Sequence, residues 1–90
     1  MKRFALPVAY TSYLVTPMVK LADYGDCDFD LRLIMVRCIE HREAMRFNVW
    51  HEFFHALMHE LGYENLESDE GFVESVALAV MRVRTEQPWL

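Results

Sequence analysis

The first part of the chain has the hydrophobic pattern of strands. Residues 3–20 are rich in β-branched and aromatic side chains that partly alternate, which predicts one or two strands with Pro7 and Pro17 at breaks or edges. Residues 23–26 (Asp-Tyr-Gly-Asp) are a turn signal, and residues 31–37 predict a further strand. Connections this short favour a meander of about three antiparallel strands.

From about residue 40 the apolar positions follow a helical period. Spacings of three and four predict a helix over residues 42–61 that ends at Gly62. The beginning of this helix is less clear, with Asn48 as a potential late cap. The apolar stripe, which we expect to face the core, consists of Phe47, Trp50, Phe54, Leu57, Met58 and Leu61.

A second helix is predicted over residues 68–86, after a short connection. Ser68 can cap its beginning, and Pro88 stops it. The sequence therefore predicts an α+β fold in which a small antiparallel sheet of about three strands packs on two helices. Ninety residues are enough for one small domain, spanning residues 1–90.

Composition and charge exclude several classes of protein. The chain is 53% hydrophobic and 13% aromatic, so it can bury a core and disorder is not expected. A formal net charge of -5 argues against binding to nucleic acid or to an anionic membrane. No apolar run has transmembrane length, and we interpret the basic, then apolar, residues 1–10 as part of the fold rather than as a signal peptide. Two cysteines without a C-x-x-C motif favour a reducing, cytoplasmic location, although a Cys27–Cys38 disulfide is an alternative.

The chemistry is concentrated in His51-Glu52-Phe53-Phe54-His55, an H-E-x-x-H motif. Residues four apart lie on one face of a helix, so that His51 and His55 can direct two imidazoles at one metal ion. Glu52 lies about 100° round the helix from His51, where its carboxylate can hydrogen-bond a metal-bound water without binding the metal. This is the zincin arrangement of two His ligands, a general base and an open coordination position. The alternative is two solvated histidines on an exposed helix face, beside an ordinary surface acid.

A catalytic zinc needs a third protein ligand. Glu74 is the first choice, because it stacks over apolar residues of the second helix, where an unpaired carboxylate is costly. Glu70, one turn earlier, is the second choice, although an acid in the first turn of a helix needs no further reason. His59 lies about 12 Å along the helix from His51, too far for both to bind one ion. His41 and the aspartates of residues 26–30 are weaker alternatives.

The stretch H-E-F-F-H-A-L-M-H at residues 51–59, followed by E-S-V-A at residues 74–77, resembles the zincin metallopeptidases of the ImmA/IrrE type. In particular it is similar to their minimal single-domain versions, which phages and prophages encode. The resemblance covers roughly the second half of the chain, and Leu78 stands where an Asn often follows the family's second motif. It implies His51, His55 and Glu74 as zinc ligands, with Glu52 as the base. It also implies a short sheet packed against the active helix and a phage protein.

These observations predict a zinc-dependent metallopeptidase that hydrolyses a peptide bond in a specific protein substrate, with Glu52 activating a zinc-bound water. We expect a protein or peptide partner, no nucleic acid and no membrane, and the cytoplasm as location (of the host cell if the protein is phage-encoded). A sheet edge near residues 31–36 is expected to hold an extended substrate. Candidate donors to the oxyanion are His59, Tyr63, Tyr24 and His41. The alternatives are a zinc-binding, non-catalytic regulator that binds a partner and a module in which zinc only stabilises a small core.

Overall fold

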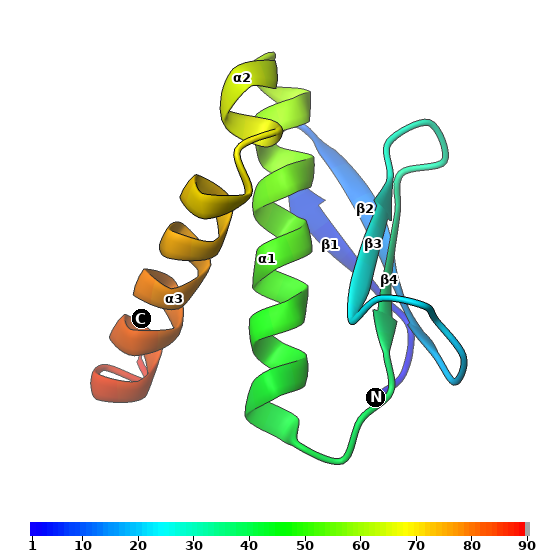
Figure 1. Ribbon diagram of the computed structural model, residues 1–90, viewed down its shortest axis with the longest axis vertical. Coiled ribbons are helices and arrows are strands. Elements are labelled where there is room, and N and C mark those ends of the chain that lie inside the picture. The colour runs from blue at the N-terminus through cyan, green and yellow to red at the C-terminus, as the bar shows by residue number, and fades with distance from the viewer. Residues whose placement is uncertain (90) are drawn as a thin grey trace.

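The computed structural model describes residues 1–89, which form four strands followed by three helices. Helix α1 lies between the sheet and α3, and the short α2 joins the two long helices (Figure 1). The predicted fold class, α+β with a small sheet packed on helices, is confirmed. The elements are β1 (Phe4–Val8), β2 (Thr11–Met18), β3 (Gly25–Asp28), β4 (Leu33–Arg37), α1 (Arg42–Glu60), α2 (Glu64–Glu67) and α3 (Glu70–Glu86).

The sheet has the strand order β1-β2-β4-β3 and differs from the expected meander in two respects. It contains a fourth strand, and β2 pairs with β4 in parallel, with Val15 opposite Ile34. The other neighbours, β1 with β2 and β3 with β4, are antiparallel. The fourth strand is β3, whose Gly-Asp-Cys-Asp sequence is typical of a turn. Its backbone pairs with β4, which returns between β2 and β3 and so leaves β3 at the edge of the sheet.

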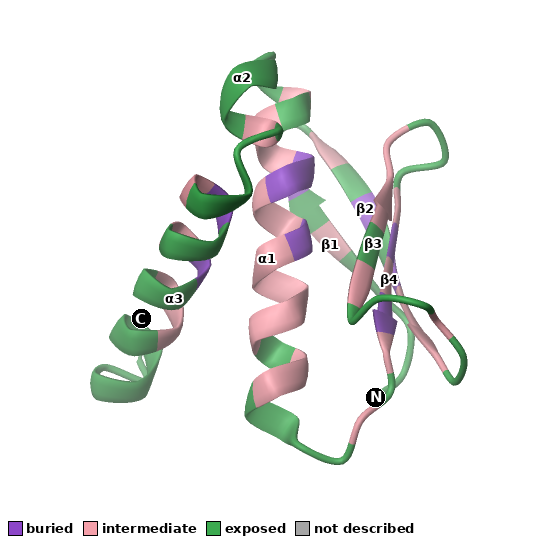
Figure 2. Ribbon diagram, viewed as in Figure 1, coloured by how far each residue is buried: buried purple, intermediate pink, exposed green. Residues whose placement is uncertain are grey.

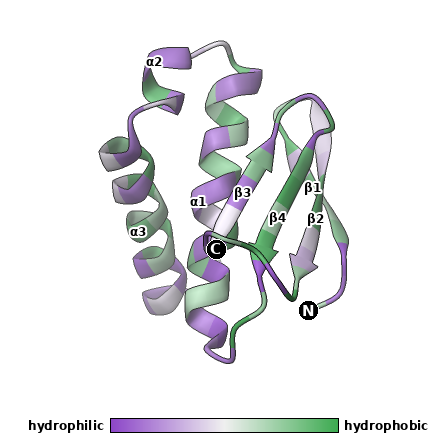
Figure 3. Cartoon of the chain, turned by 45° about the vertical axis from the view of Figure 1, so that its right-hand side comes forward, coloured by the Kyte–Doolittle hydropathy of each residue, from purple (hydrophilic) through white to green (hydrophobic). Residues whose placement is uncertain are grey.

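The core lies between one face of the sheet and α1. Figure 2 shows buried positions on β2 and β4 and on the part of α1 that faces them. In Figure 3, β4 is hydrophobic along most of its length, as expected for a strand that is paired on both edges. The buried apolar residues of this cluster are Val8, Tyr13, Val15, Ile34, Val36 and Ala56.

Helix α1 is covered on two sides, so its apolar residues form more than the single stripe expected. The residues that pack against the core cluster include Met45, Val49, Phe53 and Leu57. Of the predicted stripe only Leu57 belongs to this set; Trp50 instead borders a pocket with α3, and Leu61 is largely exposed. The stripe predicted from the sequence therefore combines residues of two helix faces, one that faces the sheet and one that faces α3.

The ends of the helices are close to those predicted. The cap of α1 is His41, whose Nδ1 accepts a hydrogen bond from the amide of Ala44, rather than Asn48. Gly62 has the positive φ of 82° that favours glycine after a helix. The cap of α3 is Asp69, one residue after the predicted Ser68, because the connection contains the extra turn of α2. Within residues 1–89, none of the helices has the length and apolar character needed to cross a membrane.

Candidate metal centre

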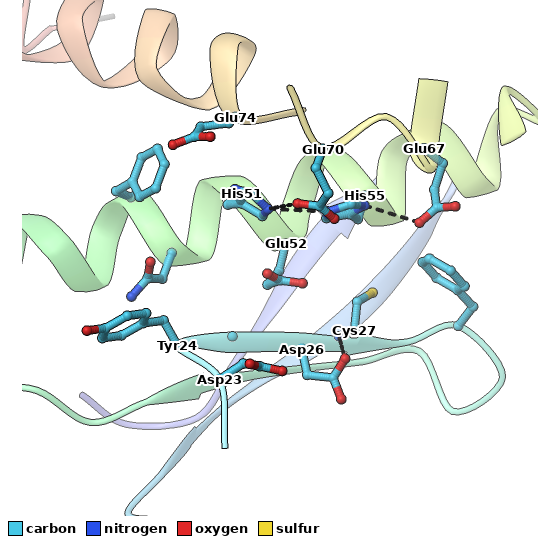
Figure 4. A pocket seen from close by; sticks show the side chains of 14 residues that line it. Asp23, Tyr24, Asp26, Cys27, His51, Glu52, His55, Glu67, Glu70 and Glu74 are labelled. Carbon is cyan, nitrogen blue, oxygen red and sulfur yellow. Dashed lines mark hydrogen bonds and ion pairs between the residues drawn. The ribbon is translucent and has the colours of Figure 1, made fainter. Parts of the chain in front are cut away.

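Three side chains from two helices converge at one point beside β3. His51 and His55 are one turn apart on α1, and their Nε2 atoms are 3.3 Å from each other. Glu70, the first residue of α3, places one carboxylate oxygen 3.0 Å from Nε2 of His51 and the other 2.9 Å from Nε2 of His55. Figure 4 shows the Glu70 carboxylate against both imidazoles. The cap at Asp69, which accepts a hydrogen bond from the amide of Phe72, fixes where α3 begins and hence where Glu70 lies.

The geometry of these three groups fits a zinc ion. One donor atom from each residue lies within 4.8 Å of the others. Ligands at about 2.0–2.1 Å from a tetrahedral zinc are about 3.3 Å apart, which is the separation of the two Nε2 atoms. A carboxylate and a neutral imidazole nitrogen without a proton are both acceptors. Their close approach requires either protons or a cation among them, and two His with one Glu is a known catalytic zinc set.

The structure brings Glu70, rather than Glu74, into contact with the histidines. Glu74 lines the same pocket one turn further along α3, but it is exposed and is not among the three converging groups. The apolar environment inferred for Glu74 from the sequence is thus absent, because that side of α3 borders an open pocket. Its assignment as a zinc ligand stays a prediction that rests on the resemblance, and both carboxylates are within the pocket.

The weaker alternatives for a ligand do not join these three groups. His59 stacks on Phe29, with ring centroids 4.1 Å apart, and His41 caps α1. Asp26 accepts a hydrogen bond from the amide of Cys27, and Asp28 from that of Leu31. None of these four residues belongs to a converging group of potential ligands within residues 1–89.

Glu52 points from α1 toward β3 and is only 8% exposed, although it is ionisable (Figure 4). A Cβ atom on Gly25 would contact the Glu52 side chain, so the absence of a side chain at Gly25 makes room for the carboxylate. The pKa of Glu52 is raised to about 7, mainly by burial; the charge of His55 lowers it, and the charges of Glu70 and Asp26 raise it. A carboxyl group with a pKa near neutrality is suited to exchange protons as a general base and acid.

Glu67 is a site residue that the sequence did not indicate. Its Oε1 lies 3.1 Å from Nδ1 of His55, on the side of the ring opposite to Glu70. The residue is on α2, in a segment interpreted as a plain connection, and it follows His55 by twelve positions with a helix end between them. No spacing rule links two such residues, so only the path of the chain after Gly62 brings them together.

The converging groups lie in a pocket of about 490 Å³ between α1, α3 and the edge strand β3. Tyr24 is the one of the four candidate oxyanion donors that lines it, whereas His41, His59 and Tyr63 do not. Cys27 also lines the pocket, and both Cys27 and Cys38 are free thiols rather than a disulfide. Burial, followed by the charge of Glu52, raises the pKa of Cys27, which favours a neutral thiol there. Six lining residues are acidic and none is Lys or Arg: Asp23, Asp26, Glu52, Glu67, Glu70 and Glu74.

The chain matches no protein-family model, and no curated protein sequence or solved structure matches it. The resemblance to the ImmA/IrrE-type metallopeptidases therefore stays a prediction from the motifs of residues 51–59 and 74–77. The class that the fold and site define is a small α+β protein whose His-His-Glu group is able to hold a metal ion.

Proposed function

We propose that the protein is a zinc-dependent metallopeptidase that hydrolyses a peptide bond in a specific protein substrate. The observation that carries this proposal is the convergence of His51, His55 and Glu70 beside a buried carboxylate, Glu52, that binds none of them. A site that only stabilised the fold would have no need of a buried base next to the ligands. The motif resemblance supports the same activity and suggests a phage-encoded, cytoplasmic protein.

The site residues would have two roles, to bind the metal and to transfer a proton. His51 and His55 would hold zinc through their Nε2 atoms, and α3 would supply a carboxylate, from Glu70 as the contacts favour or from Glu74 as the resemblance implies. When bound, zinc would polarise the substrate carbonyl and make a water molecule more acidic. Glu52 would accept the proton of the attacking water and pass it to the leaving amine. Of the candidate donors to the developing oxyanion, Tyr24 is the one that lines the pocket.

The substrate is proposed to bind as an extended strand along β3. The edge predicted from the sequence, near residues 31–36, is wrong because β4 is paired on both sides by β2 and β3. The free edge of the sheet on this side belongs to β3, and residues of β3 line the pocket that contains Glu52. Main-chain hydrogen bonds to an edge strand can hold a peptide in extended form.

The test is a proteome-wide comparison of cleavage products made by the wild type and by Glu52→Gln. The amide keeps the size of the side chain but cannot accept the proton, so we expect zinc to be retained and cleavage to be lost. Metal analysis of both proteins, purified without chelators, should give about one zinc per chain. Wild-type protein that binds no zinc after refolding with the metal would overturn the metal site. Equal biological activity of the two proteins would overturn catalysis and favour a partner-binding role.

A further inference from the structure

His55 is held between two carboxylates, one on each ring nitrogen. Its Nε2 faces Glu70 and His51, whereas its Nδ1 lies 3.1 Å from Oε1 of Glu67. The Glu67 contact is the better shielded of the two, since the Glu67 side chain is 22% exposed and that of Glu70 is 71% exposed. The His55 side chain itself is only 9% exposed. The hydrogen bond to Glu67 is therefore protected from competition with water.

This hydrogen bond determines which nitrogen of His55 is free for a metal. An ionised carboxylate only accepts hydrogen bonds, so Glu67 requires the proton of His55 to be on Nδ1. A neutral imidazole with a proton on Nδ1 has its lone pair on Nε2, the atom that faces His51 and Glu70. The same contact prevents the ring from rotating and increases the basicity of the Nε2 atom.

The backbone of α2 holds Glu67 in this place. The amide of Glu67 donates to the carbonyl of Tyr63 at 2.9 Å, directly after the turn at Gly62. That turn reverses the chain so that α2 lies beside the end of α1, next to the Nδ1 side of the His55 ring (Figure 4). Among residues 1–89, His51 makes no such contact through its Nδ1. Of the two histidines, only His55 has its ring fixed by a hydrogen bond at Nδ1 within the part of the chain that the structure describes.

We propose that Glu67 is a positioning residue for the metal centre, acting through Nδ1 of His55. The inference rests on the proposed function in so far as His55 binds zinc. It predicts that zinc affinity depends on a residue that does not touch the metal. Outer partners of this kind are typically worth about 10–100-fold in metal affinity.

The experiment measures zinc affinity by competition with a chromophoric chelator for four proteins: the wild type, Glu67→Ala, Glu67→Gln and Glu64→Ala. Glu64 is the matched control, because it is on the same short helix, and within residues 1–89 its exposed side chain makes no hydrogen bond or ion pair. We expect Glu67→Ala to lower zinc affinity about 10–100-fold. Glu67→Gln should lose less, since its amide oxygen can still accept the Nδ1 proton, and Glu64→Ala should bind as the wild type does.

Nitrogen-15 NMR of the histidine rings gives a second readout that does not depend on activity. In the metal-free proteins, the wild type should carry the His55 proton on Nδ1, whereas Glu67→Ala should show a mixture of the two tautomers. Unfolding curves of the metal-free proteins show whether a variant binds less zinc because it does not fold. If Glu67→Ala does not fold, Glu67→Gln is used in its place. Unchanged zinc affinity in Glu67→Ala, or an equal loss in Glu64→Ala, would overturn the role of Glu67 and leave the metal site intact. A wild type that binds no zinc would overturn both.

Discussion

A Cβ atom on Gly25 would lie 2.9 Å from Cγ of Glu52 and 3.0 Å from its Oε2. Distances below 3.0 Å are too short for a Cβ contact, so a side chain at Gly25 and the present position of Glu52 exclude each other. The buried carboxylate of Glu52 thus packs directly against the backbone of β3. Gly25 is important for the space it leaves open and not for a conformation that only glycine adopts, since its φ is not positive.

Gly25→Ala is expected to abolish or strongly reduce cleavage while zinc binding is retained. The added methyl group has to displace the Glu52 carboxylate, because the other side of the contact is the backbone of a paired strand. The ligands on His51, His55 and α3 are untouched. Cleavage assays and metal analysis of the same preparation would show this separation, and joint loss of zinc and fold would contradict it.

The matched control is Gly71→Ala. A Cβ at this position would meet only Oδ1 of Asp69, at an ordinary distance of 3.5 Å. Gly71 lies within α3, where alanine has the higher helix propensity by about 1 kcal/mol. We therefore expect an unchanged or increased melting temperature and unchanged cleavage. If both glycine variants lose activity equally, the loss at Gly25 has no specific connection with Glu52.

Glu70→Gln and Glu74→Gln together identify the carboxylate that binds zinc. The contacts of Glu70 with both histidines predict that Glu70→Gln weakens zinc binding by more than the roughly 10–100-fold of an outer partner, because an amide oxygen is a neutral and poorer ligand. Glu74→Gln should then have a small effect. The opposite order would support the assignment that the family resemblance implies. Equal and small effects would contradict a third ligand from α3. Titration of each variant with zinc against a competing chelator is the measurement.

The fold could be predicted to the level of its class and its helices, because these depend on local patterns. The helical period from residue 42, Gly62 and the polar residues before α3 determine two helices whose bounds differ by at most two residues from those expected. The topology of the sheet could not be predicted. It depends on β3, where pairing with β4 outweighs the turn preference of Gly25 and its neighbours. Strand preference is more dependent on context than helix preference is.

In the candidate site too, the part that depends on local sequence could be predicted and the part that depends on contacts between elements could not. His51, Glu52 and His55 are one turn of one helix, so their sequence spacing defines their arrangement in space. The groups that surround them come from other elements. Glu67 and Gly25 approach the motif from α2 and β3, and neither has a sequence signal that connects it with the motif. The expected burial of Glu74 was wrong, since the sequence cannot show whether an apolar helix face is covered, and the choice between Glu70 and Glu74 as a ligand stays a prediction.

Removal of zinc is expected to lower the melting temperature. The proposed ligands join α1 to α3, so the folded protein binds the metal better than the unfolded chain does. At free zinc about 100 times Kd, binding contributes about 2.7 kcal/mol, which for a domain of this size is a shift on the order of 10 °C. Thermal unfolding with zinc and with a chelator measures it. A melting curve that is the same in both conditions would show that the ligands do not connect the two helices.

In the metal-free protein, Glu52→Gln is expected to stabilise the fold at neutral and alkaline pH. Burial raises the pKa of Glu52 from an ordinary value of 4.5 to about 7 in the folded state. The folded protein therefore binds more protons than the unfolded chain between these values, and its stability decreases as the pH rises through this window. A shift of this size corresponds to about 3 kcal/mol, a cost that is complete above pH 7 and absent below pH 4.5.

The difference between wild type and Glu52→Gln isolates this one group, since every other ionisable residue is common to both proteins. Denaturant unfolding in chelator should give similar stabilities near pH 4.5 and a more stable glutamine variant near pH 8. With zinc bound, the positive charge beside Glu52 favours its ionised form, so the advantage of the variant should become smaller. A difference that is independent of pH in chelator would mean that Glu52 does not titrate in this range. The buried carboxylate would then be ionised in the metal-free folded protein at neutral pH, although its burial is expected to keep it protonated.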